Sequence, residues 1–299
     1  MADQAVSFEA PALPVAAPRV RARRWALLRR AWTARMAPFG AVVLSLALLM
    51  AILAPIISPY DPLKQDLTNV LLPPSGAHLL GTDNLGRDIL ARVIWGTRVS
   101  LIAGLTSVAA AVVMGSLLGL LAGFSGGLAD GLVMRLVDAV LSFPALVLAL
   151  ALGAVMGAGL TGVVVALGVV YTPTFARLMR GQVLSVRNRE YVEAARVIGS
   201  PGWRIVKQHV LPNVATPIVV QASLSIAFAI LAEASLSFLG LGIQPPAPSW
   251  GGMINQGRGY LQQAPWIVFG PGAALFVTVL GLNFVGDAIR DALDPRIRV

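Results

Sequence analysis

Six long apolar segments constrain this chain more than any other feature of its sequence. Each is long enough to cross the hydrocarbon core of a bilayer as a helix, which takes about 20 residues. Hydrophobic residues fill 57% of the 299 positions and charged residues only 12%, whereas a soluble domain is about 25% charged. Because backbone polar groups in lipid must be satisfied internally, we expect an all-α membrane protein with six transmembrane helices. We place them near residues 37–58, 99–124, 133–155, 158–178, 214–240 and 266–287.

The positions of lysine and arginine predict the orientation of these helices. Eighteen of the 23 basic residues fall in the two terminal segments or in loops on the same side as the termini. Positive charge near the ends of spans is retained in the cytoplasm. We therefore predict a multi-pass membrane protein with both termini in the cytoplasm, and we attribute the net charge of +9 to topology rather than to nucleic-acid binding. The five basic residues on the outer side are Lys64, Arg87, Arg92, Arg98 and Arg258.

The chain divides by composition into four parts. Residues 1–36 form a cytoplasmic tail, in which the arginines precede an apolar run too long for a secretory signal. Residues 37–97 hold the first span and its outer loop, residues 98–288 form the core of the protein, and residues 289–299 form a second cytoplasmic tail. The first 18 residues are rich in alanine and proline without an apolar period, so we expect them to be disordered.

The outer loop, roughly residues 59–98, is too long for a simple connector. Its second half carries an apolar stripe at helical spacing with charged residues on the opposite face. This pattern predicts an interfacial helix that leads into the second span, and direct contact with a substrate remains the alternative. The stripe consists of Ile89, Leu90, Val93 and Ile94, and the charged face of Arg87, Asp88 and Arg92.

Small residues mark one face of the second span. Gly115, Gly119 and Gly123 recur every four positions, a spacing that lets another helix approach closely. We expect this partner to be a helix of the same bundle rather than a second copy of the chain.

Acidic residues at membrane depth are costly unless they face protein or water. Glu233 in the fifth span is the strongest candidate for a group on a translocation path, and a structural hydrogen bond to a neighbouring helix explains it equally well. Asp138 and Asp287 lie near cytoplasmic helix ends, where pairing with nearby arginines suffices.

Several kinds of site are excluded by the residues present. The chain has no cysteine and only two histidines, His78 and His209, so we expect no metal site. Neither lysine, Lys64 or Lys207, follows a glycine, so there is no phosphate-binding P-loop. No histidine accompanies a serine at membrane depth, which excludes a hydrolytic triad. We therefore predict no catalytic residues and no bound cofactor in this chain.

Residues 189–212 form a charged, amphipathic segment between two spans. Residues 189–198 predict a helix with Tyr191, Ala194 or Ala195, and Ile198 on one face, and Gly199 can end it in a left-handed conformation. Two small alanines leave the face shallow, so a partner can approach the backbone, and Glu193 offers it a carboxylate. Spans on both sides make docking in a nucleic-acid groove sterically awkward.

A second helix completes this segment. Ser200 and Pro201 suit its N-cap and first turn. Pro212 is expected to mark the point where this helix gives way to the fifth span.

The segment resembles the EAA loop of binding-protein-dependent ABC importer permeases. The match consists of Glu193, Ala194 and Ala195, then Gly199, and then Leu211 and Pro212. That family has an isoleucine ten residues after the glycine, where this chain has His209; the peptide and nickel branch is similar in this respect. GTDNLGRD (81–88), PSWGGMI (248–254) and GDAIRDALDPR (286–296) also resemble the C-type permease subunit of dipeptide, oligopeptide and nickel importers.

The resemblance implies a type I importer permease fold, whose EAA loop (189–212) docks on an ATPase as a coupling helix. Its docking residues would be Glu193, Ala194, Ala195, Gly199, Leu211 and Pro212. It also implies a bacterial cytoplasmic membrane and these partners: two ATPase subunits that bind ATP and Mg²⁺, a second homologous permease and an external solute-binding protein. The sequence does not identify the solute, because similar permeases handle peptides, nickel chelates, glutathione and short glycopeptides. A secondary transporter or channel without an ATPase remains the alternative.

Overall fold

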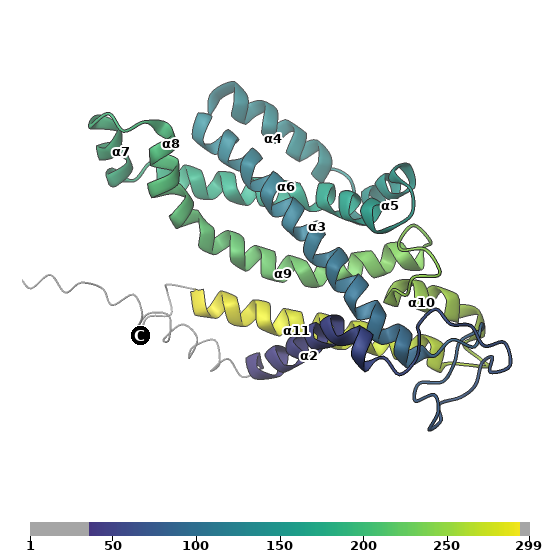
Figure 1. The fold of residues 1–299 in the computed structure, drawn as a ribbon. Helices are drawn as coiled ribbons and strands as arrows, with labels where there is room; N and C mark the ends of the chain where they lie inside the picture. The colour runs from purple at the N-terminus through teal and green to yellow at the C-terminus, as the bar shows by residue number, and fades with distance from the viewer. Residues whose placement is uncertain (1–35, 294–299) are drawn as a thin grey trace, which may run out of the picture.

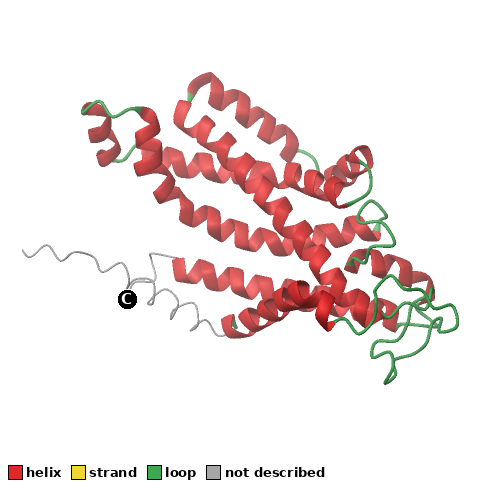
Figure 2. Cartoon of the chain, viewed as in Figure 1, coloured by secondary structure: helices red, strands yellow, loops and turns green. Residues whose placement is uncertain are grey.

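The structure, a computed structural model, describes residues 36–293. Within these residues every regular element is a helix, apart from one isolated bridge between Thr82 and Asp88 (Figure 2). Most of the two predicted tails lies outside the described residues. The predicted all-helical class is confirmed for the part that the structure describes.

Five helices are long and apolar enough to cross a membrane. They are α2 (Ala37–Ile57), α3 (Ile89–Ser125), α6 (Leu160–Arg187), α9 (Leu211–Phe238) and α11 (Trp266–Leu293) (Figure 1). All five agree with predicted spans in position. Four of them, α3, α6, α9 and α11, extend beyond a predicted edge, because a helix can continue outside its apolar stretch.

The predicted third span, residues 133–155, is not one straight helix. It is divided into α4 (Gly127–Leu141) and α5 (Ala145–Met156), which meet at an angle of 93°. Proline cannot donate a backbone hydrogen bond, and it disfavours helical geometry at the preceding residue. Pro144 therefore accounts for the break between Leu141 and Ala145, and the described residues hold six spans only if this bent pair counts as one.

The bundle has two distinct ends (Figure 1). At the tip end, α7 (Glu190–Val197) and α8 (Gly202–Ile205) project beyond the other helices, and a π-helical turn, η1 (Val206–Val210), connects α8 to α9. The start of α2 and the end of α11 lie at this same end. At the opposite, loop end lie residues 58–88, α10 (Trp250–Gly257) and the 3₁₀ turn η2 (Arg258–Tyr260).

The packing of α3 against α6 centres on the predicted glycine face. A Cβ atom added to Gly115, Gly119 or Gly123 would lie only 2.7–2.9 Å from the Cβ atoms of Phe175, Met179 and Val183 on α6. Glycine is therefore required for the close approach of these helices. The predicted packing partner, a helix of the same bundle, is confirmed.

The predicted interfacial helix at residues 89–94 is wrong as a separate element. These residues are the first turns of α3, which continues without a break to Ser125. Asp88 caps the helix, because its carboxylate accepts a hydrogen bond from the Ala91 N–H at 2.7 Å. The opposite carboxylate oxygen of Asp88 lies 2.9 Å from His78 Nδ1.

The charged face of this region is buried by protein and does not face headgroups. Arg87 Nε donates to Asp83 at 2.7 Å, Arg87 Nη2 donates to Gln256 on α10 at 3.1 Å, and Arg92 Nε lies 3.6 Å from the same Asp83 carboxylate. Periodicity could not reveal these partners, because Asp83 lies in an irregular loop and Gln256 is 169 residues away in sequence.

Two tryptophans further fasten the loop end. The Trp250 indole donates to the Val93 carbonyl at 3.1 Å, and the Trp266 indole donates to the Thr82 carbonyl at 3.2 Å. Within the loop, a hydrogen bond from the Thr68 hydroxyl, with others from Asn69 and from the Thr68 N–H, holds the pKa of Asp66 below its usual value. Residues 58–88 are thus an ordered cap on the bundle.

Candidate functional site: the tip of the bundle

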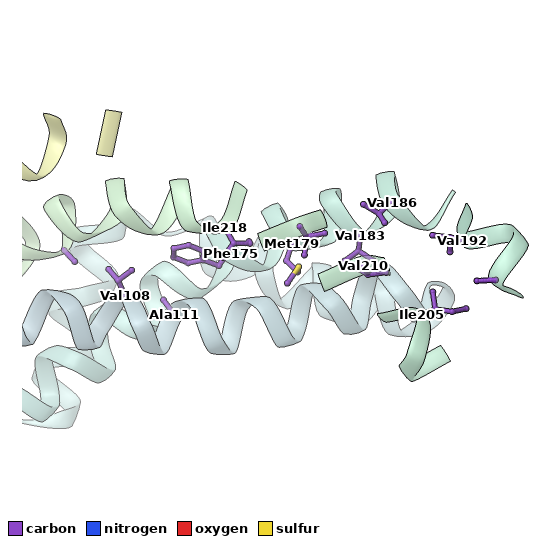
Figure 3. Close-up of a cluster of buried hydrophobic side chains, with 13 residues drawn as sticks. Val108, Ala111, Phe175, Met179, Val183, Val186, Val192, Ile205, Val210 and Ile218 are labelled. Carbon is purple, nitrogen blue, oxygen red and sulfur yellow. The ribbon is translucent and has the colours of Figure 1, made fainter. Parts of the chain in front are cut away.

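The tip, defined here as residues 188–210, stands on a buried apolar base. Val192 and Ala195 of α7 and Ile205 of α8 belong to the same buried cluster as Val183 and Val186 at the end of α6 (Figure 3). Only two residues separate α6 from α7. The base therefore fixes the tip to α6 on one side and to α9 on the other.

Gly199 ends α7 in the predicted left-handed conformation. Its φ is +78°, and a Cβ atom at this position would meet nothing within 4 Å. The Gly199 N–H donates to the Arg196 carbonyl at 2.9 Å, and the Ser200 N–H donates to the Ala195 carbonyl at 3.0 Å. These two carbonyls at the end of α7 are therefore satisfied. The backbone conformation, not crowding, is what favours glycine here.

The second helix of the tip differs from its prediction. Pro201, not Ser200, occupies the N-cap of α8, and α8 runs through η1 into α9 as one helical stretch from Gly202 to Phe238. Pro212 lies in the first turn of α9, where the π turn gives way to the fifth span, as predicted, and the helical stretch continues through it. The π turn ends with the Leu211 N–H bonded to the Val206 carbonyl.

The structure separates the predicted docking residues into two groups. Glu193, Ala194 and Gly199 are exposed, and so are Leu211 and Pro212 at the start of α9. In contrast, Ala195 is buried in the base of the tip. The prediction left open whether Ala194 or Ala195 shares the face of Tyr191 and Ile198, and the structure favours Ala194. Tyr191, Ala194 and Ile198 face outward, whereas Ala195 lies with Val192, three residues earlier, on the inner face.

Three large apolar side chains of the tip are strongly exposed. Val197 is 87% exposed, Ile198 81% and Trp203 65%, and the guanidinium of Arg204 lies 5.6 Å from the Trp203 ring centre. Sequence reasoning missed Val197 and Trp203. Their signal is present, however, since large apolar residues in a charged segment outside the spans are informative when they remain uncovered.

Charged residues of the tip are also exposed. They are Arg189, Glu190, Glu193, Arg196, Arg204 and Lys207. Protein–protein interfaces combine buried apolar side chains with polar and charged ones. The geometry can therefore bind a partner by apolar burial and orient it by charge.

Glu233, the second predicted site, lies inside the subunit near the loop end. Its carboxyl is fully buried, and Oε1 accepts a hydrogen bond from Ser237 at 2.8 Å. Oε2 has no hydrogen-bond partner, and neither does the neighbouring Ser100 hydroxyl of α3. The one hydrogen bond of this carboxyl therefore runs within α9 and not to a neighbouring helix. The structural role and the role on the translocation path both stay predictions.

Of the other two acids at membrane depth, Asp138 accepts a hydrogen bond from Arg177 at 2.7 Å, as predicted, and Asp287 is exposed near the end of α11. Among residues 36–293, no three histidine, aspartate or glutamate side chains converge in a way that could hold a metal ion.

Comparison with protein families identifies the chain. The model of binding-protein-dependent transport system inner membrane components matches residues 115–299, more than half of the chain. The chain belongs to this family. A second model, the N-terminal TM domain of oligopeptide transport permease C, matches residues 25–74. The resemblance stated on sequence motifs is thereby confirmed.

Curated members of the family are similar over most of their length. The probable D,D-dipeptide transport system permease protein DdpC of Escherichia coli K12 is 46% identical over 257 residues, 86% of each chain. The di/tripeptide transport system permease protein DppC of Pseudomonas aeruginosa is 46% identical, covering 87% of this chain and 88% of that protein. The glutathione transport system permease protein GsiD of Pectobacterium atrosepticum is 42% identical, covering 85% and 84%.

Solved structures support the fold. A chain from an inward-facing structure of the MetNI methionine ABC transporter aligns with a TM-score of 0.57 and 21% identity, over 69% of this chain and 98% of that chain. The predicted type I importer permease fold is confirmed. This family member is a permease subunit of an ATP-coupled importer, not an enzyme, and ATP hydrolysis belongs to separate subunits.

Proposed function

We propose that this chain forms half of the translocation path of a peptide importer in the bacterial inner membrane. In this proposal an external solute-binding protein delivers di- or oligopeptides to the loop end, and a homologous second permease completes the path. The complex has two ATPase subunits, which bind ATP and Mg²⁺, and one of them docks at the cytoplasmic tip of this chain. The names of the relatives, which include dipeptide and glutathione permeases, support this solute class. Both chain termini lie in the cytoplasm with the tip.

The observation that carries the proposal is the exposed apolar surface on a firmly packed tip. Burying side chains such as Val197, Ile198 and Trp203 contributes about 1.5–3 kcal/mol each, before the entropy cost of association. Glu193 lies exposed on the same helix and can pair with an arginine of the ATPase. Because the base of the tip is continuous with the core around α6 and α9, movement of the docked ATPases is passed to the membrane helices.

Two single substitutions test docking. Glu193→Arg reverses the charge of one docking residue. Gly199→Asp adds a charged side chain in open space, at a φ of +78° that is strained for a residue other than glycine. We expect both variants to insert in the membrane but to lose ATPase co-purification and ATP-dependent uptake. Lys64→Glu, a charge reversal on the exposed loop, is the matched control for ATPase binding. Normal co-purification and uptake in both tip variants would overturn the proposed docking site.

Orientation has its own test. The chain lacks cysteine, so Trp203→Cys places a single thiol at the tip. A membrane-impermeant maleimide should label this thiol in inverted vesicles and leave it unlabelled in intact spheroplasts. The opposite pattern would place the tip outside the cell and contradict ATPase docking.

The solute requires a transport assay in proteoliposomes that contain the complete complex. We expect ATP-dependent uptake of radiolabelled dipeptide. Uptake of nickel or glutathione with no uptake of peptide would reassign the solute class. Uptake that persists after inactivation of the ATPase would instead favour a secondary transporter or channel.

A further inference from the structure

Three arginines on one face of α6 bind α4 and the end of α3. Arg177, Arg180 and Arg187 are separated by three and seven residues, a spacing that places them along one side of a helix. Each of them donates to a group outside α6. The motifs that identify the family do not include these contacts.

The contacts divide between α4 and the end of α3. Arg180 binds Asp130 through two parallel hydrogen bonds, with Nη2 and Oδ2 2.7 Å apart. Arg177 Nη2 donates to Asp138 at 2.7 Å. Arg187 Nη1 donates to the Gly123 carbonyl in the last turn of α3 at 2.8 Å. Both aspartates belong to α4, eight residues apart.

Apart from these ion pairs, α4 is thinly packed. Val137 is its only buried residue, and Leu128, Leu132 and Leu136 are all exposed. An apolar cavity of about 340 Å³ lies between α3, α4 and α6, lined in part by Val137. A helix with little core of its own depends on its polar contacts for its position.

Both ends of α4 are points where the backbone changes direction. Gly126 and Gly127, which precede most of the helix, have φ values of +68° and +54°, and a Cβ atom on Gly127 would meet nothing within 4 Å. At the other end, the chain bends by 93° before α5, next to Pro144. These two joints allow α4 to change its angle without unwinding its neighbours.

Helix α6 connects these contacts directly to the tip. It ends at Arg187, only two residues before α7, and Val186 shares the buried base with Val192. We propose that Arg177 and Arg180 are positioning residues that make α4 move together with α6 when the tip is displaced. This inference rests on the proposed function, because the docked ATPases supply the displacement.

The two ion pairs differ in expected importance. The side chains of Arg180 and Asp130 are 33% and 21% exposed, whereas those of Arg177 and Asp138 are 59% and 62% exposed. Exposed pairs are weakened by solvent, and a bidentate arginine–carboxylate pair is the stronger geometry. Loss of the Arg180–Asp130 pair should therefore impair coupling more than loss of the Arg177–Asp138 pair.

A charge-swap series tests the linkage in proteoliposomes with the complete complex. Arg180→Asp should lower ATP-dependent import by about threefold to tenfold, while ATPase co-purification and ATP hydrolysis persist. Arg180→Asp combined with Asp130→Arg should restore import. Arg177→Asp should have a smaller effect. Wild-type import by Arg180→Asp would overturn the inference, and so would a failure of the folded double variant to recover.

A reversible crosslink gives a second test that does not depend on how well Arg180→Asp folds. Asp130→Cys and Arg180→Cys provide the only two thiols of the chain, and a short bis-methanethiosulfonate reagent can join them. If α4 moves with α6, the crosslinked protein should import at no less than half the wild-type rate, and reduction of the link should lower import again. The single-cysteine variants treated with reagent are the controls. Loss of import on crosslinking would show that α4 must separate from α6, which contradicts the inference.

Import by the wild-type complex in the same proteoliposomes distinguishes failure of the proposed function from failure of the linkage between α6 and α4. Absence of ATP-dependent import by the wild-type complex would contradict the proposed function itself. Wild-type import that the swap leaves unchanged, or that the crosslink abolishes, would contradict only the linkage between α6 and α4.

Discussion

Gly119 on α3 is expected to be intolerant of even one additional methyl group. In Gly119→Ala, the new Cβ would lie 2.8 Å from the Met179 Cβ and against the backbone of Ala176 on α6. Rotation of a side chain relieves neither contact, because the backbone fixes the position of a Cβ atom as well as its own. The two helices must therefore separate along the face that brings them together.

The expected magnitude is the balance of two opposing effects. Replacing glycine by alanine inside a helix favours the helix by about 0.5–1 kcal/mol. Overpacking typically costs about 1–3 kcal/mol, and the fixed backbone of Ala176 places this site toward the upper value. The net effect is a destabilisation of about 1–2 kcal/mol, which corresponds to a fall in midpoint temperature of about 2–6 °C.

Gly181→Ala on α6 is the matched control. Gly181 is exposed and a Cβ atom there meets nothing within 4 Å, so only the gain in helix propensity remains. Thermal unfolding of the detergent-purified protein should show a lower midpoint for Gly119→Ala and an unchanged or higher midpoint for Gly181→Ala. An equal rise in both variants would refute the role assigned to the glycine face.

Two further predictions concern buried polar groups. Glu233→Ala removes the acceptor of the Ser237 hydroxyl and should alter uptake kinetics while the complex still assembles. Glu233→Gln keeps the size and the hydrogen bond and should behave like wild type. Wild-type uptake by the alanine variant would count against this prediction. Arg87→Met leaves the buried Asp83 carboxylate without its closest partner and should lower the free energy of unfolding by about 3 kcal/mol. Limited proteolysis of residues 58–88 and the midpoint temperature of unfolding would detect this loss. Adding Asp83→Asn should recover part of that loss, and an unchanged midpoint in Arg87→Met alone would show that the loop is held by other contacts.

Local patterns predicted most of the helices and their packing. Apolar length located five spans, and the glycine spacing located the face of α3 that meets α6, because both properties depend on residues close together in sequence. The left-handed end of α7 at Gly199 was also predictable, since few other residues adopt that conformation. The family motifs then identified the fold.

Features that depend on contacts between residues far apart in sequence could not be predicted from local patterns. The charges of Arg87 and Arg92 were expected to face headgroups, because nothing near them in sequence indicates burial against Asp83 and Gln256. The inward position of Ala195 likewise depends on packing with α6 and α8. The break at Pro144 had a local signal, but apolar length outweighed it.

The exposed apolar surface of the tip has a consequence for biosynthesis. When no ATPase is bound, Val197, Ile198 and Trp203 remain in contact with water, as they would in an unassembled subunit. Such a surface attracts chaperones and proteases that remove orphan subunits. The cellular amount of this permease should therefore follow the supply of its ATPase, so that deletion of the ATPase gene depletes the permease even when its transcription is unchanged.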